Sequence, residues 1–255
     1  MDFVSPVPFA HTLSEPVFIH QSEKIRAAVG KLQLDELKAV MRVSDRLARE
    51  IQSLYRTPAR EKAAFWAYTG DVYRGLQAPS MSMMDGDWAQ EHFLVPSAVY
   101  GLLRPYDAIR PYRLEMQAKL AVDGNATMYE FWGETLARYV QAREQQPLLV
   151  LSSDEYARAV TRSLPASCQV ITPQFFDTKP DGTVGQVPIY SKQMRGVMAR
   201  WVIDNRVEDP ARLPAFSGQG YMYDAVRSAE GAPVYTRKHM KPLDLPTKAG
   251  LQNIR

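Results

Sequence analysis

The chain of 255 residues has few of the side chains on which disulfide-bonded, metal-binding or membrane proteins depend. It contains a single cysteine, Cys168, so no disulfide can form within the chain and a reducing compartment is favoured. The four histidines lie far apart, with no HExxH motif and no paired Cys-His spacing, so we expect no metal site. No apolar run approaches the length that spans a bilayer, and the N-terminus shows no secretory signal. We therefore expect a cytoplasmic protein that does not contact membranes.

The overall amino-acid composition is typical of a soluble globular protein, with 45% apolar and 23% charged residues. We expect residues 1–240 to form a single compact domain and residues 241–255 to form a loosely ordered tail. The net charge is only +3, but Lys and Arg are concentrated over residues 37–62 and again near the C-terminus. Such local basic patches suit a nucleic-acid binder with a defined face, and they equally suit an ordinary solvated surface.

Hydrophobic periodicity predicts a mixed α/β (α+β) fold with a helical N-terminal part and a mixed sheet. We expect helices over residues 21–32, 34–41, 44–55, 57–70, 127–144, 152–164 and 191–207. We expect strands or extended segments over residues 2–7, 93–103, 147–152, 168–176, 220–226 and 233–238. The glycine- and proline-containing segment 69–80 is predicted to be a loop. Ser44 and Ser191 are candidate N-caps, and Ser152 with Glu155 matches a capping box.

An Arg-Pro-Tyr sequence occurs twice within ten residues, at 104–106 and 110–112, with Asp107 between the copies. Each proline fixes φ and disfavours a helical conformation in the arginine before it. We therefore expect a stiff loop that presents arginines, whose planar guanidinium suits two-pronged contact with phosphate or carboxylate. The segment after the second copy alternates as in a strand, which places Arg113 and Glu115 on one face.

Several longer segments of the chain together resemble the YaaA family of peroxide stress proteins. They are TGDVYRGL, SAVYGLLRPYDAIRPYRLEM, MYEFWG, SSDEYARAV, VITPQF, SKQMRGVMARW and GYMY, in this order. The resemblance extends from about residue 40 to about residue 237. The chain departs from the family pattern at its N-terminus, where Ser5-Pro6-Val7-Pro8 stands in place of Ser-Pro-Ala-Lys.

The resemblance implies a cytosolic protein with a compact α/β fold, a basic cleft and a helix-hairpin-helix element that binds DNA. It also implies a role in limiting oxidative damage to DNA. The helix-hairpin-helix would lie at about residues 34–55, with Val40, Val43, Leu47 and Ile51 as its packed positions. Backbone N–H groups at the start of the second helix would bind a phosphate, and nearby polar and basic residues would assist: Arg42, Ser44, Arg46 and Arg49. The alternative is two packed helices in which Ser44 is a plain N-cap.

The predicted cleft combines basic residues from distant segments with acid/base candidates. The basic residues, expected to converge and hold a ligand or phosphate, are Arg104, Arg113, Lys192 and Arg195. The acid/base candidates, relevant only if the protein is an enzyme, are Asp71, Tyr73 and Glu115. Each has a structural alternative, such as a turn cap for Asp71 and a salt bridge between Arg113 and Glu115.

The first functional hypothesis is a DNA-binding protein that grips the backbone of double-stranded DNA through the helix-hairpin-helix and the cleft. The alternative is an enzyme that acts on a nucleotide or a nucleobase in the same cleft. A third possibility is a scaffold whose basic face binds an acidic partner. No P-loop, nucleophile elbow or metal motif indicates a reaction type, and we expect no cofactor. The sequence does not define an oligomeric state.

Overall fold

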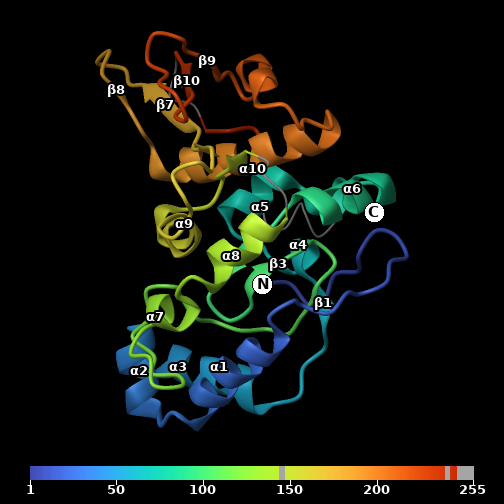
Figure 1. Ribbon diagram of the computed structural model, residues 1–255, viewed down its shortest axis with the longest axis vertical. Helices are drawn as coiled ribbons and strands as arrows, with labels where there is room; N and C mark the ends of the chain where they lie inside the picture. Colours follow the sequence, from blue (N-terminus) through green and yellow to red (C-terminus); the bar gives the residue numbers. More distant parts are fainter. Residues whose placement is uncertain (144–146, 239–241, 246–255) are drawn as a thin grey trace.

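The structure is a computed structural model that describes residues 1–143, 147–238 and 242–245 (Figure 1). Its α-helices are α1 (Ile19–Lys31), α2 (Leu34–Met41), α3 (Asp45–Arg56), α4 (Ala64–Ala67), α5 (Asp71–Leu76), α6 (Met83–His92), α7 (Met128–Trp132), α8 (Thr135–Ala142), α9 (Asp154–Thr161) and α10 (Pro188–Asp204). Two 3-10 turns are η1 (Ala78–Ser80) and η2 (Pro210–Ala215). The strands are β1 (Lys62–Ala63), β2 (Val95–Ser97), β3 (Gly101–Leu103), β4 (Ala108–Ile109), β5 (Leu148–Leu149), β6 (Val170–Ile171), β7 (Gln174–Thr178), β8 (Val184–Gly185), β9 (Met222–Tyr223) and β10 (Val234–Arg237). These elements confirm the mixed α/β fold.

The N-terminal part is helical, as predicted, and α1, α2 and α3 pack together at one end of the molecule (Figure 1). Ile25, Leu37 and Ile51 are at most 1% exposed and belong to the main apolar core. The predicted packed positions Val40, Val43 and Leu47 are partly buried against the same core. Amphipathic spacing was therefore sufficient to locate α2 and α3 and the side chains that hold them.

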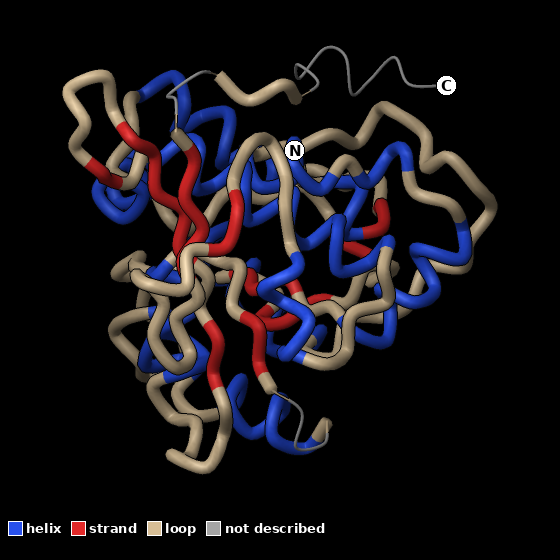
Figure 2. Tube along the Cα trace, turned by 90° about the horizontal axis from the view of Figure 1, so that it is seen from above, coloured by secondary structure: helices blue, strands red, loops and turns tan. Residues whose placement is uncertain are grey.

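The strands form several small sheets rather than one continuous sheet (Figure 2). The largest has the order β8-β7-β10-β9, with β7 and β10 parallel and antiparallel strands at both edges. The parallel pair places Phe175 opposite Tyr235, and both side chains are at most 1% exposed. Beside them, the buried Asp177 accepts hydrogen bonds from Arg237 and from the Tyr221 hydroxyl. Every predicted strand segment except residues 2–7 contains a strand.

Helices α5 and α10 cross with their backbones in direct contact. A Cβ atom on Gly196 would lie 1.8 Å from the carbonyl oxygen of Val72, and one on Gly75 would lie 2.1 Å from that of Gln193. Only glycine permits such an approach. Because Ile203 of α10 belongs to the main core while Met198 belongs to the cluster under the C-terminal sheet, α10 joins the two apolar clusters.

This crossing overturns the prediction of a loop over residues 69–80, because residues 71–76 form α5. Gly70 is the N-cap of α5, and Gly75 lies inside the helix at the contact with α10. Glycine commonly indicates a loop, whereas here Gly75 makes helix packing possible. Asp71 and Tyr73 are therefore held on a helix.

Three other local predictions were wrong because long-range contacts decide the conformation. The helix expected over residues 57–70 is replaced by β1, which pairs with β4, and by the single turn α4. The helix expected over residues 127–144 is divided into α7 and α8 at Gly133, whose φ is +47°. Residues 2–7 form no strand, since the Lys62 ammonium instead binds the carbonyls of Asp2 and Ser5.

Two predicted helix caps were also wrong. Helix α9 has Ser153 as its N-cap, and the Glu155 carboxylate accepts a hydrogen bond from the backbone N–H of Gln117. Ser191 lies within α10, is 8% exposed, and donates its hydroxyl to the carbonyl of Phe175. Lys192 and Arg195 are therefore farther from the start of α10 than expected.

Most of the predicted tail, residues 241–255, lies outside the described residues. Residues 242–245 are described, and the backbone of Asp244 exchanges two hydrogen bonds with the Gln219 side chain. Among the helices described, none combines the length and apolar character needed to cross a bilayer.

The crossing of α5 and α10 generates a stability prediction. Gly196→Ala should lower the free energy of unfolding by about 3 kcal/mol or more, because its Cβ would meet backbone that cannot move aside. Gly30→Ala in α1 is the matched control, since its Cβ would have no contact closer than 3.8 Å. That substitution should raise stability by about 0.5–1 kcal/mol through helix propensity. Urea unfolding measures the free energy of unfolding of both variants. If Gly196→Ala and Gly30→Ala change it equally, the backbones of α5 and α10 are not in close contact at Gly196.

Candidate functional site

The first arginine of the repeated Arg-Pro-Tyr sequence is held by a buried carboxylate. Asp107 is 0% exposed and accepts hydrogen bonds from the Arg104 backbone N–H and side-chain nitrogens at 2.8–3.1 Å. The Ser14 hydroxyl donates to the same carboxylate at 2.7 Å, and Arg104 also reaches the carbonyl of Glu15. Arg104 therefore fixes the loop against the N-terminal segment.

The second copy of the sequence leads into an extended segment with alternating burial. The Arg110 side chain pairs with Glu23 of α1. Leu114 is 3% exposed, whereas Arg113 and Glu115 are exposed, as the alternation predicted. The Glu115 carboxylate accepts a hydrogen bond from the Gln117 amide at 3.3 Å. Among the described residues, the Arg113 side chain forms no ion pair, so its charge is available to a partner.

Between this segment and α5 lies a cluster of tyrosines that the sequence did not single out as a unit. The Ser97 and Tyr112 hydroxyls are 2.7 Å apart, and the Tyr112 and Tyr68 hydroxyls are also 2.7 Å apart. The Tyr73 ring, one of the predicted site residues, stacks on Tyr68 with centroids 4.9 Å apart. The three tyrosines come from α5, the segment before it and the second Arg-Pro-Tyr copy.

The direction of the Ser97–Tyr112 hydrogen bond follows from counting lone pairs. Ser97 Oγ accepts the backbone N–H groups of Val99 and Tyr100, which occupies both of its lone pairs. Ser97 therefore donates to Tyr112. In the next hydrogen bond, between the Tyr112 and Tyr68 hydroxyls, either oxygen can be the donor.

Burial keeps these phenols neutral. It raises the pKa of Tyr112 to about 12, while hydrogen bonds from Ser97 and Tyr68 partly oppose the rise. Burial also raises the pKa of Tyr73 and of Tyr156. The cluster therefore offers hydrogen bonds and flat apolar surface near neutral pH and carries no negative charge.

The predicted acid Asp71 stands at the first position of α5. Its carboxylate lies 3.5 Å from the Arg74 guanidinium, and the two side chains are 31% and 19% exposed. This ion pair lies within one turn of the helix, so Asp71 has the structural partner that a turn or helix residue commonly has.

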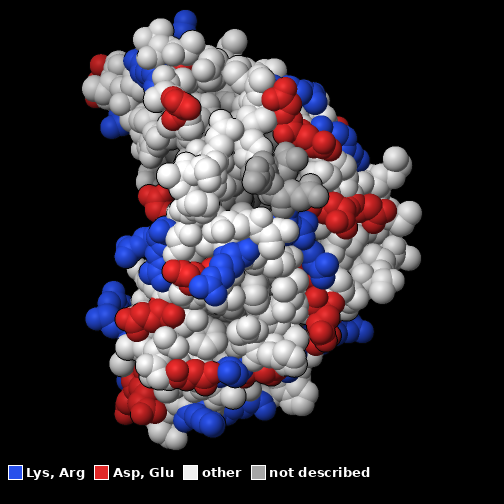
Figure 3. Space-filling view, viewed as in Figure 1, with Lys and Arg blue, Asp and Glu red and all other residues white. Residues whose placement is uncertain are grey.

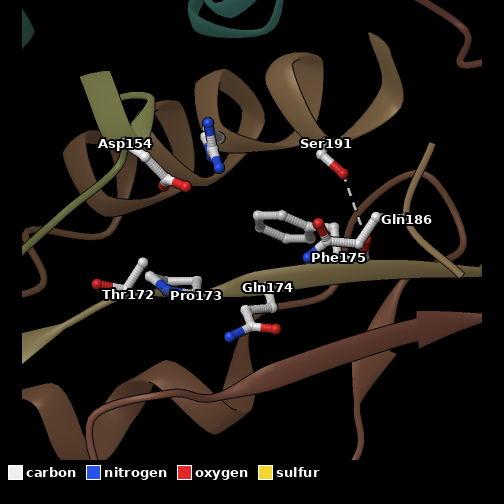
Figure 4. Close-up of a pocket in the computed structure, with 8 residues that line it drawn as sticks. Asp154, Thr172, Pro173, Gln174, Phe175, Gln186 and Ser191 are labelled. Atoms are coloured by element: carbon white, nitrogen blue, oxygen red, sulfur yellow. Dashed lines mark hydrogen bonds between the residues drawn. The ribbon is translucent and has the colours of Figure 1, made fainter. Parts of the chain in front are cut away.

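A small cavity lies between α9, the β6–β7 connection and α10 (Figure 4). Its volume is about 200 Å³, and its lining residues are Asp154, Thr172, Pro173, Gln174, Phe175, Gln186, Ser191 and Arg195. Of the four basic residues predicted to converge, Arg195 lines this cavity, while Lys192 is exposed on α10. Burial lowers the pKa of Arg195, and the charge of Asp154 opposes this shift.

The predicted DNA-binding turn joins α2 to α3. Arg42 adopts a left-handed conformation, with φ 53° and ψ 52°, and Ser44 is the N-cap of α3 without a side-chain capping bond. The Lys38 ammonium lies 2.6 Å from the Asp45 carboxylate, and a hydrogen bond from Lys38 lowers the pKa of Asp45. The Arg46 side chain is 86% exposed and pairs with Glu50.

Charged residues of both signs alternate over the face shown in Figure 3, where the described residues form no continuous basic surface. Among the described residues, no group of three or more His, Cys, Asp and Glu side chains could hold a metal ion.

Sequence reasoning missed the polar residues opposite Arg195. Asp154 and Gln174 lie within segments already singled out, SSDEYARAV and VITPQF, but each looked like an ordinary helix start or strand residue. The sequence could not show that Asp154 and Gln174 lie near Arg195, because α9 and β7 meet α10 only through tertiary packing.

Comparison with known proteins assigns nearly the whole chain to one family. A family model described as peroxide stress protein YaaA matches residues 1–227. A UPF0246 protein of Maricaulis maris is 39% identical over 231 residues, which cover 87% of each chain. UPF0246 proteins of Burkholderia multivorans and Paracidovorax citrulli are 36% and 39% identical, and each match covers 93% of this chain and 95% of the relative.

The tyrosine cluster predicts a loss of stability at alkaline pH. Because the pKa of Tyr112 is about 12 in the folded chain and 10.0 when exposed, the unfolded chain loses this proton first as the pH rises. The stability that Tyr112 contributes is present below pH 10 and is lost between about pH 10 and 12. Tyr112→Phe should flatten the pH dependence of the unfolding free energy there by up to about 1.4 kcal/mol per pH unit. Urea unfolding at several alkaline pH values measures this slope for the natural chain and the variant. If the two slopes are equal, the Tyr112 hydroxyl is exposed to solvent in the folded protein and its pKa is not raised by burial.

Proposed function

The chain belongs to the YaaA family of peroxide stress proteins, and we propose that it serves this response by binding the backbone of double-stranded DNA. The turn between α2 and α3 is the observation that carries the proposal. At this turn the N-terminus of α3 carries the positive end of a helix dipole, and Ser44 does not cap it with its side chain. A phosphate is the ligand that such a helix end accepts most readily.

The charges around the turn favour an anion. Arg42 and Arg49 are exposed, and neither side chain forms a hydrogen bond or ion pair with another described residue. The one acidic side chain at the start of α3, Asp45, pairs with Lys38 at 2.6 Å, and Lys38 also lies 3.4 Å from the Asp35 carboxylate of α2. The ion pair of Arg46 with Glu50 is so exposed that it would exchange easily for a phosphate contact.

The cleft residues would add further phosphate contacts in this proposal. Arg113 and Lys192 are exposed, whereas Arg104 already pairs with Asp107. The enzymatic alternative has less support, since Asp71 pairs with Arg74 and Glu115 is exposed. General acid–base catalysis at neutral pH usually needs a carboxyl group with a tuned environment.

The DNA proposal predicts a salt-dependent affinity that is largely independent of base sequence, because binding to phosphates carries no base information. The double variant Arg42→Gln, Arg46→Gln should weaken binding to all duplexes alike. It should also lower the slope of log affinity against log salt by about one for each phosphate that the variant no longer neutralises. Fluorescence anisotropy with labelled duplexes over a range of salt concentrations measures both quantities.

Arg138→Gln is the matched control, because Arg138 of α8 is 75% exposed and, among the described residues, pairs with Glu134, the N-cap of the same helix. This variant should bind DNA as the natural chain does. If the double variant and the control have the same affinity and slope, the α2–α3 turn is a packed helical corner and does not bind DNA.

A second substitution separates stability from binding at the same residue. Arg42→Gly should raise the unfolding free energy by about 0.5–1 kcal/mol, because glycine adopts the left-handed conformation without the strain of a side chain. The same variant should bind DNA more weakly, because glycine has no cationic group to pair with a phosphate. Thermal unfolding and anisotropy test the two effects, and a stabilised variant with undiminished affinity would exclude Arg42 from the interface.

A further inference from the structure

The cavity beside Arg195 has unused hydrogen-bonding capacity on three sides. Asp154 stands at the start of α9, Thr172 lies in the β6–β7 connection, Gln174 is the first residue of β7, and Gln186 precedes α10 (Figure 4). None of these side chains, nor that of Arg195, forms a hydrogen bond or ion pair with another described residue. The Ser191 hydroxyl differs, since it donates to the Phe175 carbonyl. Polar side chains that converge on a cavity without partners are typical of a binding site.

The two charged side chains have opposite signs and do not meet. The Arg195 nitrogens and the Asp154 oxygens are more than 4.0 Å apart, so the two side chains form no salt bridge. They are nevertheless near enough for the Asp154 charge to raise the pKa of Arg195. Arg195 is only partly exposed, and a desolvated guanidinium without a partner is costly. In Figure 4 the Asp154 carboxylate points toward the cavity. Both side chains line the cavity, so one molecule inside it can hydrogen-bond to both.

We propose that this cavity binds a free α-amino acid, whose carboxylate pairs with Arg195 and whose ammonium pairs with Asp154. A guanidinium binds a carboxylate through two parallel hydrogen bonds, and a carboxylate binds an ammonium at about 2.7–2.9 Å. Gln174, Gln186 and Thr172 then remain to contact the rest of the ligand. The volume of about 200 Å³ is small, which suits a ligand of this size.

The same observations disfavour nucleotides in this cavity. A phosphate on Arg195 would bring two negative charges near Asp154. A nucleobase needs an open flat face for stacking, but Phe175 is 1% exposed and its ring already stacks on Tyr235. The inference does not depend on DNA binding, because none of the lining residues belongs to α2, α3 or the turn between them.

The test measures thermal unfolding of the full chain with each common free amino acid at about 10 mM, followed by calorimetry on those that raise the melting temperature. At least one should bind, while its α-amide, which lacks the carboxylate, and its N-acetyl derivative, which lacks the ammonium, should not. Arg195→Gln and Asp154→Asn should each weaken binding by about tenfold or more. Lys179→Gln removes an exposed positive charge from the loop between β7 and β8, outside the cavity, and should leave binding unchanged.

Stability without ligand separates a binding role from a structural one. Arg195→Gln should leave the melting temperature of the free protein unchanged or raise it, because the guanidinium has no described partner to lose. A clear fall would overturn the proposal by giving Arg195 a structural role. Absence of any response to amino acids would also overturn it. So would equal binding of the amide or N-acetyl derivatives, or a response to guanosine monophosphate that depends on Arg195. Loss of DNA binding in Arg42 variants has no bearing on any of these outcomes.

Discussion

The backbone contact between α5 and α10 is the constraint on which the arrangement of the molecule depends. At Gly75 and Gly196 the two helices approach more closely than any side chain would allow. This contact seats α10 on the N-terminal body, and α10 in turn contributes to both apolar clusters. The position of Arg195 follows from it, since Arg195 precedes the glycine at the crossing. A cavity between α9, β7 and α10 exists because α10 is fixed at this point.

The structure separates cations that maintain the fold from cations that remain available to a partner. Arg104 is held by the buried Asp107, and Arg237 by the buried Asp177 between parallel strands. Lys62 is 8% exposed and binds the N-terminal segment. Removal of Arg104 or Arg237 would leave a buried carboxylate without a counter-charge, which costs about 3–5 kcal/mol. Arg42 and Arg195 have no such described partner, and they carry the two proposals made for this protein.

Several predictions failed at the same kind of residue, a glycine or a serine whose role depends on what packs beside it. Gly75 looked like a loop signal and lies within a helix, while Gly133 looked like a helix residue and divides one. Ser191 looked like an N-cap and is buried within α10, bonded to a strand. Local propensity is worth less than about 1 kcal/mol at such positions, so tertiary contacts override it. The amphipathic helices α2 and α3 were predicted well because their apolar faces are repeated over two or more turns.

The sequence by itself determined the family, the helical N-terminal part, most strand segments and the alternating burial around Arg113 and Glu115. These features depend on residue order and on local periodicity, which can be read from the sequence without knowledge of the fold. Only the tertiary structure decided which arginines are free, because Arg104 and Arg195 look alike as sequence and differ in what surrounds them. Arg104 has a buried carboxylate three residues away, whereas Arg195 faces Asp154 across a gap that exists only after α9 and α10 have packed. Charge pairing depends on distance, and distances between remote segments are set by the packing of the fold.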